Sequence, residues 1–315
     1  MPFTFGLPYP ACLAATRIAR KLKFKVPRAS HLDQEVYFKD QYHSTERLIK
    51  RFAGLIDVKD RVILDVGSGL GGRAPWFIEQ GARAVYCIDV NRQELTRGRT
   101  ILDRLFPTSM TKSVIFIHPS EIRDEQFGDV ALLIDCFEHL TDASAVLHDV
   151  HEWLRPNGIL WIGSIGWYHY LASHCNSHIP IPWSQVFFSE KAILRTIRTI
   201  LREPDYKPNV WEQLEGIGRW DNVQTLRDRP GEPLNMLSLR QVRKIVLNSE
   251  FQEIQFKVHG FGGARSKLLY WLRSLSQVPV LDEFLHSYYT VHALNQPKSS
   301  SIAATTARQV RTTEV

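Results

Sequence analysis

The chain has 315 residues, of which 44% are apolar and 23% are charged, and these fractions are ordinary for a globular protein. They exclude a collagen, a disulfide scaffold and a mostly disordered chain, and they allow one large domain with a substantial core. The formal net charge of +6 permits an acidic partner or a membrane surface without requiring either.

The four cysteines are scattered along the chain and form no CxxC pair. We therefore expect a reduced, cytoplasmic compartment and no metal site built from cysteines. No apolar run approaches the ~20 residues that a transmembrane helix needs, so we expect no membrane span.

Residues 1–32 contain no acidic residue, and six basic residues alternate there with apolar ones. One interpretation is a basic, partly ordered leader on a cytosolic protein. The other is an amphipathic segment that contacts a membrane surface, or a transit peptide. A secretory signal does not fit, because the charge follows the apolar stretch. We expect the first interpretation and keep peripheral membrane contact through residues 1–32 as the alternative.

Short apolar runs alternate with helical patterns from residue 44 to residue 295. Ser44 is expected to cap the first helix, whose apolar face includes Leu48 and Phe52. Strands are predicted at residues 62–64, 84–88, 113–117, 130–134, 159–162, 253–258 and 287–294. Further helices are predicted at residues 75–80, 91–106, 143–154, 190–201 and 239–248, the last two capped by Ser189 and Ser238. This alternation predicts an α/β fold, with a Rossmann-like, doubly wound sheet and helices on both faces.

The alternation breaks after Ser164, and the residues that follow are rich in Trp, Tyr, His and Pro. We therefore expect residues 165–236 to be a cap of helices and loops inserted into one domain, residues 44–295. Residues 1–43 would form the leader and an N-terminal cap. Residues 296–315, rich in Ser, Thr and Ala, would form a disordered tail.

The insertion carries aromatic and histidine side chains that suit either a pocket or a core. The aromatic residues are dense enough to line an apolar pocket, although such clusters are more often core: Trp167, Tyr168, Tyr170, Trp183, Phe187 and Phe188. Three histidines, His169, His174 and His178, raise a metal hypothesis. Because no acid or cysteine stands near them at ligand spacing, we predict no metal site.

A glycine-rich turn follows the apolar strand at residues 62–64, in the segment Asp65–Gly72. Glycines let the backbone approach a ligand closely, and the helix that begins there offers free N–H groups. The glycines also fit the dinucleotide pattern GxGxxG, which alone is a weak signal. Asp89 ends the next strand, where an acid can accept both ribose hydroxyls of an adenosine ligand. Asp65 and Asp89 together therefore indicate a nucleoside site at the carboxyl edge of the sheet.

Four motifs in order resemble those of the class I S-adenosylmethionine-dependent methyltransferases. Residues 65–71, DVGSGLG, match the first motif of that family, DxGxGxG, and Asp89 matches its ribose-binding acid. Residues 129–140, DVALLIDCFEHL, match the fourth-strand motif ending in EHL, which is common in ubiquinone-biosynthesis-type and related small-molecule methyltransferases. Residues 154–158, LRPNG, match the turn before the fifth strand. A dehydrogenase would account for the glycines but not for the last two motifs.

The resemblance covers residues 44–164 and resumes at 238–295. It implies a seven-stranded sheet whose last strand is antiparallel, with S-adenosyl-L-methionine lying across the carboxyl ends of the first strands. Asp65 would lie near the methionine amino group, and Asp89 would hold the ribose. The cofactor residues that the resemblance implies are Asp65, Gly67, Ser68, Gly69, Gly71, Asp89, Val90, Asn91, Ser120, Glu121 and Asp135. Ser120 and Glu121 stand where many relatives have an acid near the adenine.

Methyl transfer from a sulfonium requires an acceptor held in line and shielded from water more than it requires acid–base chemistry. The resemblance puts Asp135, Glu138 and His139 near the transferred methyl group, just past the fourth strand. His139 is the natural base, because imidazole titrates near neutrality. The alternative is that Glu138 and His139 cap the following helix and orient the loop.

The sequence therefore predicts a methyltransferase for a small, aromatic or apolar acceptor. A nucleic-acid substrate is not expected, because the fourth strand lacks the NPPY-type clamp that holds a flipped base. Two alternatives stay open: an enzyme that uses S-adenosylmethionine without methyl transfer, and a non-catalytic protein that binds it.

Overall fold

The computed structural model describes residues 3–22, 33–53, 56–208, 212–213, 216–229, 233–260 and 274–296. The strands are β1 (Val62–Val66), β2 (Ala84–Ile88), β3 (Val114–Ile117), β4 (Gly128–Ile134), β5 (Leu154–Ser164), β6 (Gln252–Gly260) and β7 (His286–Asn295). The helices are α1 (Tyr9–Lys21), α2 (Gln34–Leu48), α3 (Ala74–Glu79), α4 (Arg92–Leu105), α5 (Thr108–Thr111), α6 (Ala143–Trp153), α7 (Ser184–Phe187), α8 (Glu190–Leu201), α10 (Leu239–Leu247) and α12 (Leu281–Leu285). Each predicted strand is present, and the predicted helices beyond residue 70 are confirmed to within a few residues.

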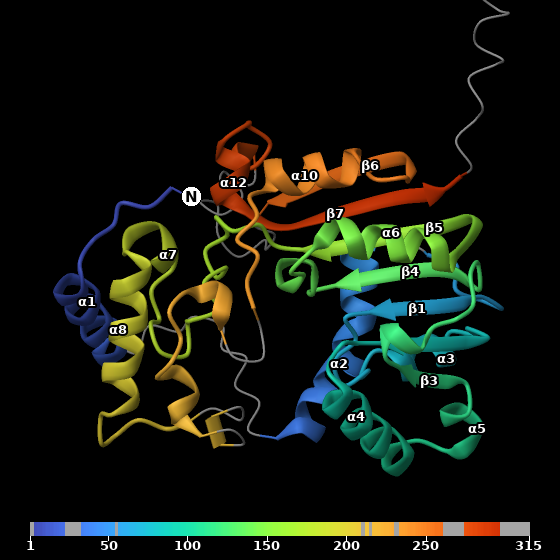
Figure 1. Ribbon diagram of the computed structural model, residues 1–315, viewed down its shortest axis with the longest axis horizontal. Coiled ribbons are helices and arrows are strands. Elements are labelled where there is room, and N and C mark those ends of the chain that lie inside the picture. Colours follow the sequence, from blue (N-terminus) through green and yellow to red (C-terminus); the bar gives the residue numbers. More distant parts are fainter. Residues whose placement is uncertain are drawn as a thin grey trace, which may run out of the picture.

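The strands form one sheet in the order β3-β2-β1-β4-β5-β7-β6 (Figure 1). β1 pairs in parallel with β2 and β4, β2 pairs in parallel with β3, and β4 with β5. β7 is antiparallel to both β5 and β6. The predicted doubly wound sheet with an antiparallel last strand is therefore confirmed. Because the first strands are parallel, their carboxyl ends meet at one edge, where ligands of such sheets bind.

Helices cover both faces of the sheet, because β1 is buried throughout and β4 is buried except at Asp129. On one face, Leu147 of α6 and Val242 of α10 belong to a single apolar core. On the other face, Phe38 of α2, Phe77 of α3 and Leu102 of α4 form a second core. The two cores fix the sheet between its helices and so fix the edge that carries the site.

The helix α2 begins well before its predicted start at Ser44. Asp33 caps it instead, because one carboxylate oxygen of Asp33 accepts two backbone N–H hydrogen bonds, at 2.6 and 3.3 Å. Ser44 lies inside the helix, and its hydroxyl donates to the Gln41 carbonyl oxygen at 3.2 Å. The prediction that Ser44 caps the helix was wrong. Apolar periodicity is clear only from Leu48 on, whereas the complete burial of Phe38 stabilises the earlier turns.

The insertion forms an apolar cluster of its own together with α1, beside the sheet (Figure 1). Cys12 of α1 and Ile193 of α8 are both fully buried in this cluster. Ser189 caps α8 as predicted, since its hydroxyl oxygen accepts the Ala192 N–H at 3.2 Å. Of the predicted aromatic residues, Trp167 is part of this core, whereas Phe187 is exposed.

The helix α1 attaches the first part of the predicted leader to the insertion. Arg17 and Arg20 both pair with Glu203, at N–O distances of 3.1 and 3.4 Å. Residues 23–32 of the predicted leader and residues 297–315 of the predicted tail lie outside the described residues, so both assignments stay predictions. None of the helices in the described ranges is long and apolar enough to cross a bilayer.

Gly98 on α4 provides a test of the packing beneath the site. A Cβ at this position would lie 2.2 Å from the backbone carbonyl oxygen of Leu70, which cannot move aside as a side chain can. We expect Gly98→Ala to lower the free energy of unfolding by about 1–3 kcal/mol, measured by urea unfolding. Gly218→Ala is the control, because the nearest atom to its Cβ would be 3.7 Å away. Equal stability of the two variants would contradict this account.

Candidate active site

The chain leaves β1 through a glycine loop, residues 67–72, whose shape only glycine accommodates. Gly67, Gly69 and Gly71 have φ angles of +74°, +54° and +69°, in the left-handed region that side chains disfavour. A Cβ at Gly67 would lie 2.6 Å from the Cβ of Cys136, and one at Gly71 would lie 2.7 Å from the ring of Phe116. The loop is therefore held between the turn after β4 and the strand β3.

Asp89, at the end of β2, is bonded to this glycine loop. One of its carboxylate oxygens accepts the Gly69 N–H at 2.8 Å, and the other accepts the Asn91 N–H at 2.8 Å. Asn91 in turn caps α4, and the neighbouring Val90 is 77% exposed. The structure thus brings these predicted cofactor residues together at one edge. Each oxygen of Asp89 keeps a further lone pair that can accept a hydroxyl.

Asp65 and Ser68 are buried polar residues, and each has a side-chain oxygen that the described residues leave without a hydrogen bond. The Oδ2 atom of Asp65 and the hydroxyl of Ser68 make no hydrogen bond to any described residue. Burial raises the pKa of Asp65 to about 6, with Arg73 opposing this rise and Asp89 adding to it. Because buried polar groups are normally satisfied, this pair fits a polar ligand that completes the site.

A cavity of about 490 Å³ opens beside the glycine loop, and α2 covers it. Its lining residues come from α2, the glycine loop, α3 and the end of β4: Tyr37, Asp40, Gln41, His43, Ser44, Arg47, Gly67, Ser68, Gly69, Arg73, Ile134 and Asp135. No sequence motif identified the residues of α2 as part of this site. Tyr37, Gln41, Ser44 and Arg47 recur at helical spacing and form one polar stripe, but that signal is readable only once the helix is known to begin at Gln34.

Asp135 is held from two sides. Arg73 donates to its Oδ2 from the start of α3 at 3.0 Å, and the Tyr288 hydroxyl donates to its Oδ1 from β7 at 2.8 Å. Arg73 is only 7% exposed. Neither Arg73 nor Tyr288 was identified from the sequence, because no spacing links them to Asp135. With both oxygens engaged, Asp135 is better suited to positioning than to proton transfer.

The turn Phe137–His139 after β4 is hydrogen-bonded to the end of the insertion. The Asn235 backbone N–H donates to the Glu138 carbonyl at 2.9 Å, and its side chain donates to the Phe137 carbonyl at 2.6 Å. The Pro233 carbonyl accepts a hydrogen bond from His139 Nδ1 at 2.8 Å. Since a carbonyl only accepts, Nδ1 carries the proton and Nε2 is left as an acceptor.

Glu138 points inward from the same turn. The Ser164 hydroxyl at the end of β5 donates to its Oε2 atom. Burial raises the pKa of this carboxyl, and the neighbouring His139 opposes the rise. Glu138 is therefore a half-buried carboxyl that is oriented by one hydroxyl and keeps a second oxygen for another partner.

Ser120 and Glu121 follow β3, and both interact with Arg92 and His118. Glu121 pairs with Arg92, and this interaction lowers the pKa of the Glu121 carboxyl. The Ser120 hydroxyl bonds to His118 Nδ1 at 2.7 Å. Both lie at the carboxyl edge of the sheet but do not line the cavity.

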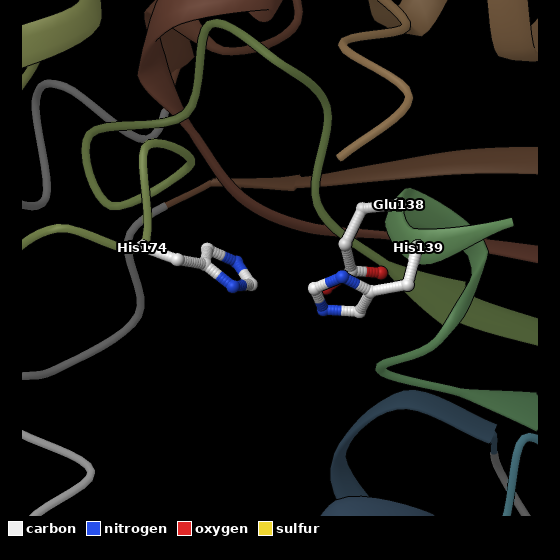
Figure 2. A group of neighbouring side chains, drawn as sticks. All are labelled: Glu138, His139 and His174. Carbon is white, nitrogen blue, oxygen red and sulfur yellow. The ribbon is translucent and has the colours of Figure 1, made fainter. Parts of the chain in front are cut away.

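The three histidines of the insertion go to three different places. His178 forms a buried pair with Glu212 at 2.6 Å, and His169 packs against the ring of His286 with centroids 5.2 Å apart. His174 alone reaches the site, where its ring lies edge-on to that of His139 at 4.9 Å (Figure 2).

A comparison with known families agrees with this geometry. Residues 64–160 match the family model described as a methyltransferase domain. The chain carries a class I S-adenosylmethionine-dependent methyltransferase domain. The small-molecule, ubiquinone-biosynthesis-like subtype that the EHL motif suggested stays a prediction.

Curated relatives of this methyltransferase domain share only part of their length with the chain. A glycine/sarcosine/dimethylglycine N-methyltransferase of Actinopolyspora halophila is 30% identical over 125 residues, which are 36% of this chain and 20% of that protein. A protein arginine N-methyltransferase of Oryza sativa subsp. japonica is 28% identical over 129 residues, 39% of this chain and 31% of that protein. The chain thus matches between a fifth and a third of these relatives.

Among solved structures, an S-adenosylmethionine-dependent methyltransferase from Mesorhizobium loti aligns with 81% of this chain and 99% of its own. The sequence identity is 16% and the TM-score is 0.47.

The buried carboxyl of Asp65 predicts a dependence of stability on pH. The pKa of this carboxyl is about 6 in the folded protein, whereas the ordinary pKa of an aspartate is 3.8. The folded state therefore binds the proton more tightly, and the free energy of unfolding falls as the pH rises through this window. We expect the free energy of unfolding of the parent protein to fall by about 2–3 kcal/mol between pH 4 and pH 7.5. The Asp65→Asn protein should not show this fall when both are measured by urea unfolding without cofactor.

The control for this experiment is Asp103→Asn, because Asp103 is a half-exposed acid on α4 paired with Arg99. It should follow the pH profile of the parent protein. A profile of Asp65→Asn that is parallel to that of the parent would contradict the account of Asp65.

Proposed function

We propose that the protein transfers the methyl group of S-adenosylmethionine to a small, aromatic or apolar acceptor at the carboxyl edge of β1 and β4. The observation that carries this proposal is the pair of buried, unsatisfied atoms, Asp65 Oδ2 and Ser68 Oγ, beside the bond between Asp89 and Gly69. The methyltransferase domain at residues 64–160 supports the same cofactor.

The residues at this edge fit the chemistry of the cofactor. Asp65 offers a carboxylate to the methionine amino group, and Asp89 offers acceptors to the ribose hydroxyls. The cradle formed by the glycine loop brings backbone close to the ligand. Val90 and Asn91, past the end of β2, suit contact with the adenine. Arg47, which lines the cavity from α2, is a cation suited to the methionine carboxylate.

S-adenosylmethionine supplies, when bound, a methyl group that is already activated on a sulfonium. The residues of the chain therefore have to hold the acceptor in line and exclude water. His139 Nε2 is the atom suited to take a proton from an acceptor that must lose one, because Nδ1 is engaged by Pro233. Glu138 and Asp135 fit supporting roles, the first beside the imidazole and the second as a fixed anion.

The insertion, residues 165–236, is the part of the chain that we propose covers the acceptor. Asn235 and Pro233 connect it directly to the turn that carries Glu138 and His139. The curated relatives are named for acceptors of very different size, glycine and protein arginine. The proposal of a small acceptor therefore depends on the turn Phe137–His139, here called the EHL turn, and on the insertion that covers it.

Substitution of Asp89 tests the cofactor site. Asp89→Ala removes the acceptors for the ribose hydroxyls, and we expect the affinity for S-adenosylmethionine to fall by roughly 10- to 150-fold, the cost of charge-assisted hydrogen bonds. Isothermal titration measures the affinity, and circular dichroism checks the fold. Asp103→Ala serves as the control acid. A folded Asp89→Ala protein that binds the cofactor as tightly as the parent would place the site elsewhere.

Substitution of His139 separates proton transfer from architecture. We expect His139→Gln to reduce the rate of label transfer from radiolabelled S-adenosylmethionine into small molecules of a cell extract by about 10²–10⁴, with little change in cofactor affinity. His148→Gln is the control, since His148 is an exposed histidine that pairs with Glu250. A folded His139→Gln protein with near-normal transfer would remove His139 as the base and leave positioning as the source of rate.

A further inference from the structure

Three side chains with metal-ligating atoms meet between the sheet and the insertion (Figure 2). Glu138 and His139 come from the turn after β4, and His174 comes from the insertion. One ligand atom of each lies within 4.8 Å of the others. Figure 2 shows the His174 ring directed toward His139, with the Glu138 carboxylate close to the same imidazole.

Two of the three side chains are oriented as metal ligands usually are. His139 donates its Nδ1 proton to the Pro233 carbonyl, so the lone pair of Nε2 is available. Glu138 receives the Ser164 hydroxyl on Oε2, which leaves Oε1 for another partner. Such outer hydrogen bonds to a backbone carbonyl or a hydroxyl fix the tautomer and the direction of metal ligands.

His174 is held at this position by an unusual backbone conformation. Its φ angle is +50°, in the left-handed region that residues other than glycine rarely adopt. Its N–H donates to the Leu171 carbonyl at 3.0 Å, which closes a tight turn. The ring makes no hydrogen bond to any described residue. At this site it packs edge-on against the ring of His139. A strained turn thus presents to the other two groups an imidazole that has no hydrogen-bonding partner in the described part of the chain.

We propose that Glu138, His139 and His174 bind a divalent transition-metal cation, with Zn²⁺ as the preferred ion. Two imidazole nitrogens and one carboxylate oxygen are a donor set of open zinc sites, which keep a fourth position for water or substrate. Mg²⁺ and Ca²⁺ prefer oxygen ligands alone. Ligand atoms on one zinc lie about 3.4 Å apart, given bonds near 2.1 Å, so movements of about 1 Å would complete the site.

This proposal revises the expectation from the sequence that the chain has no metal site. The spacing of His169, His174 and His178 gave no set of ligands. The fold supplies one by bringing a single histidine of the insertion to the EHL turn.

A cation here would have a consequence for the acceptor, and this consequence rests on the proposed function. The EHL turn follows Asp135, which lines the cofactor cavity. An acceptor oxygen or nitrogen bound at the open position would hold its proton less tightly, because the cation stabilises the deprotonated form. His139 would then act as a ligand of the cation, and the cation would replace it as the group that favours loss of the proton.

Binding of Zn²⁺ to the untagged, full-length protein tests the site directly. The protein is stripped with a chelator, desalted and titrated with Zn²⁺ against a competing indicator dye. We expect one tightly bound ion per chain. His174→Gln and Glu138→Gln should each weaken binding by at least the ~10–100-fold that loss of an outer hydrogen-bonding partner costs. Co²⁺ substitution should give the visible absorption of a site with nitrogen ligands, which His174→Gln changes.

The matched control is His148→Gln, which disrupts another histidine–glutamate pair, the exposed His148 and Glu250 at 3.3 Å. It should bind Zn²⁺ as the parent does. The proposal is overturned if the parent binds no stoichiometric Zn²⁺, or if folded His174→Gln and Glu138→Gln proteins bind it unchanged. If one of these variants fails to fold by thermal unfolding, the other and His139→Gln decide the result.

A parallel titration with S-adenosylmethionine separates this proposal from the proposed function. A protein that binds Zn²⁺ but not S-adenosylmethionine retains the cation site and loses the proposed function. A protein that binds S-adenosylmethionine but not Zn²⁺ overturns the cation site alone.

Discussion

The hydrogen bond from the Gly69 N–H to the Asp89 carboxylate connects the ends of β1 and β2, and the site is organised around it. It requires a loop in the left-handed region, which glycine permits. It also requires residues without a side chain at Gly67 and Gly71, because a Cβ there would clash with Cys136 or Phe116. The same loop leaves Asp65 Oδ2 buried without a hydrogen bond to any described residue, a cost that a polar ligand would offset.

The second organising feature is the contact between the EHL turn and the end of the insertion. Asn235 binds the turn through its backbone N–H and its side-chain amide, and Pro233 binds it through its carbonyl, so the positions of Glu138 and His139 depend on residues far away in the chain. The insertion is therefore part of the site as well as a neighbour of the sheet. A change in its packing would reach the EHL turn through these hydrogen bonds.

Local patterns predicted much of this structure. The strands, the Ser189 and Ser238 caps and the edge with Asp65 and Asp89 depend on neighbouring residues, which periodicity and capping rules describe. The missed features depend on tertiary contacts. Phe38 stabilises the early turns of α2 only through burial, Tyr288 reaches Asp135 from β7, and His174 meets Glu138 across the fold. The spacing of residues in a single sequence does not predict such tertiary contacts.

We propose above all that the edge formed by β1, β2 and α2 binds S-adenosylmethionine, and a crystal structure of the protein with S-adenosylhomocysteine would decide this. We expect electron density in the cavity beneath α2, with the ribose hydroxyls within hydrogen-bond distance of Asp89 and the amino group beside Asp65. Density for the ligand at another place, or a ribose turned away from Asp89, would contradict it.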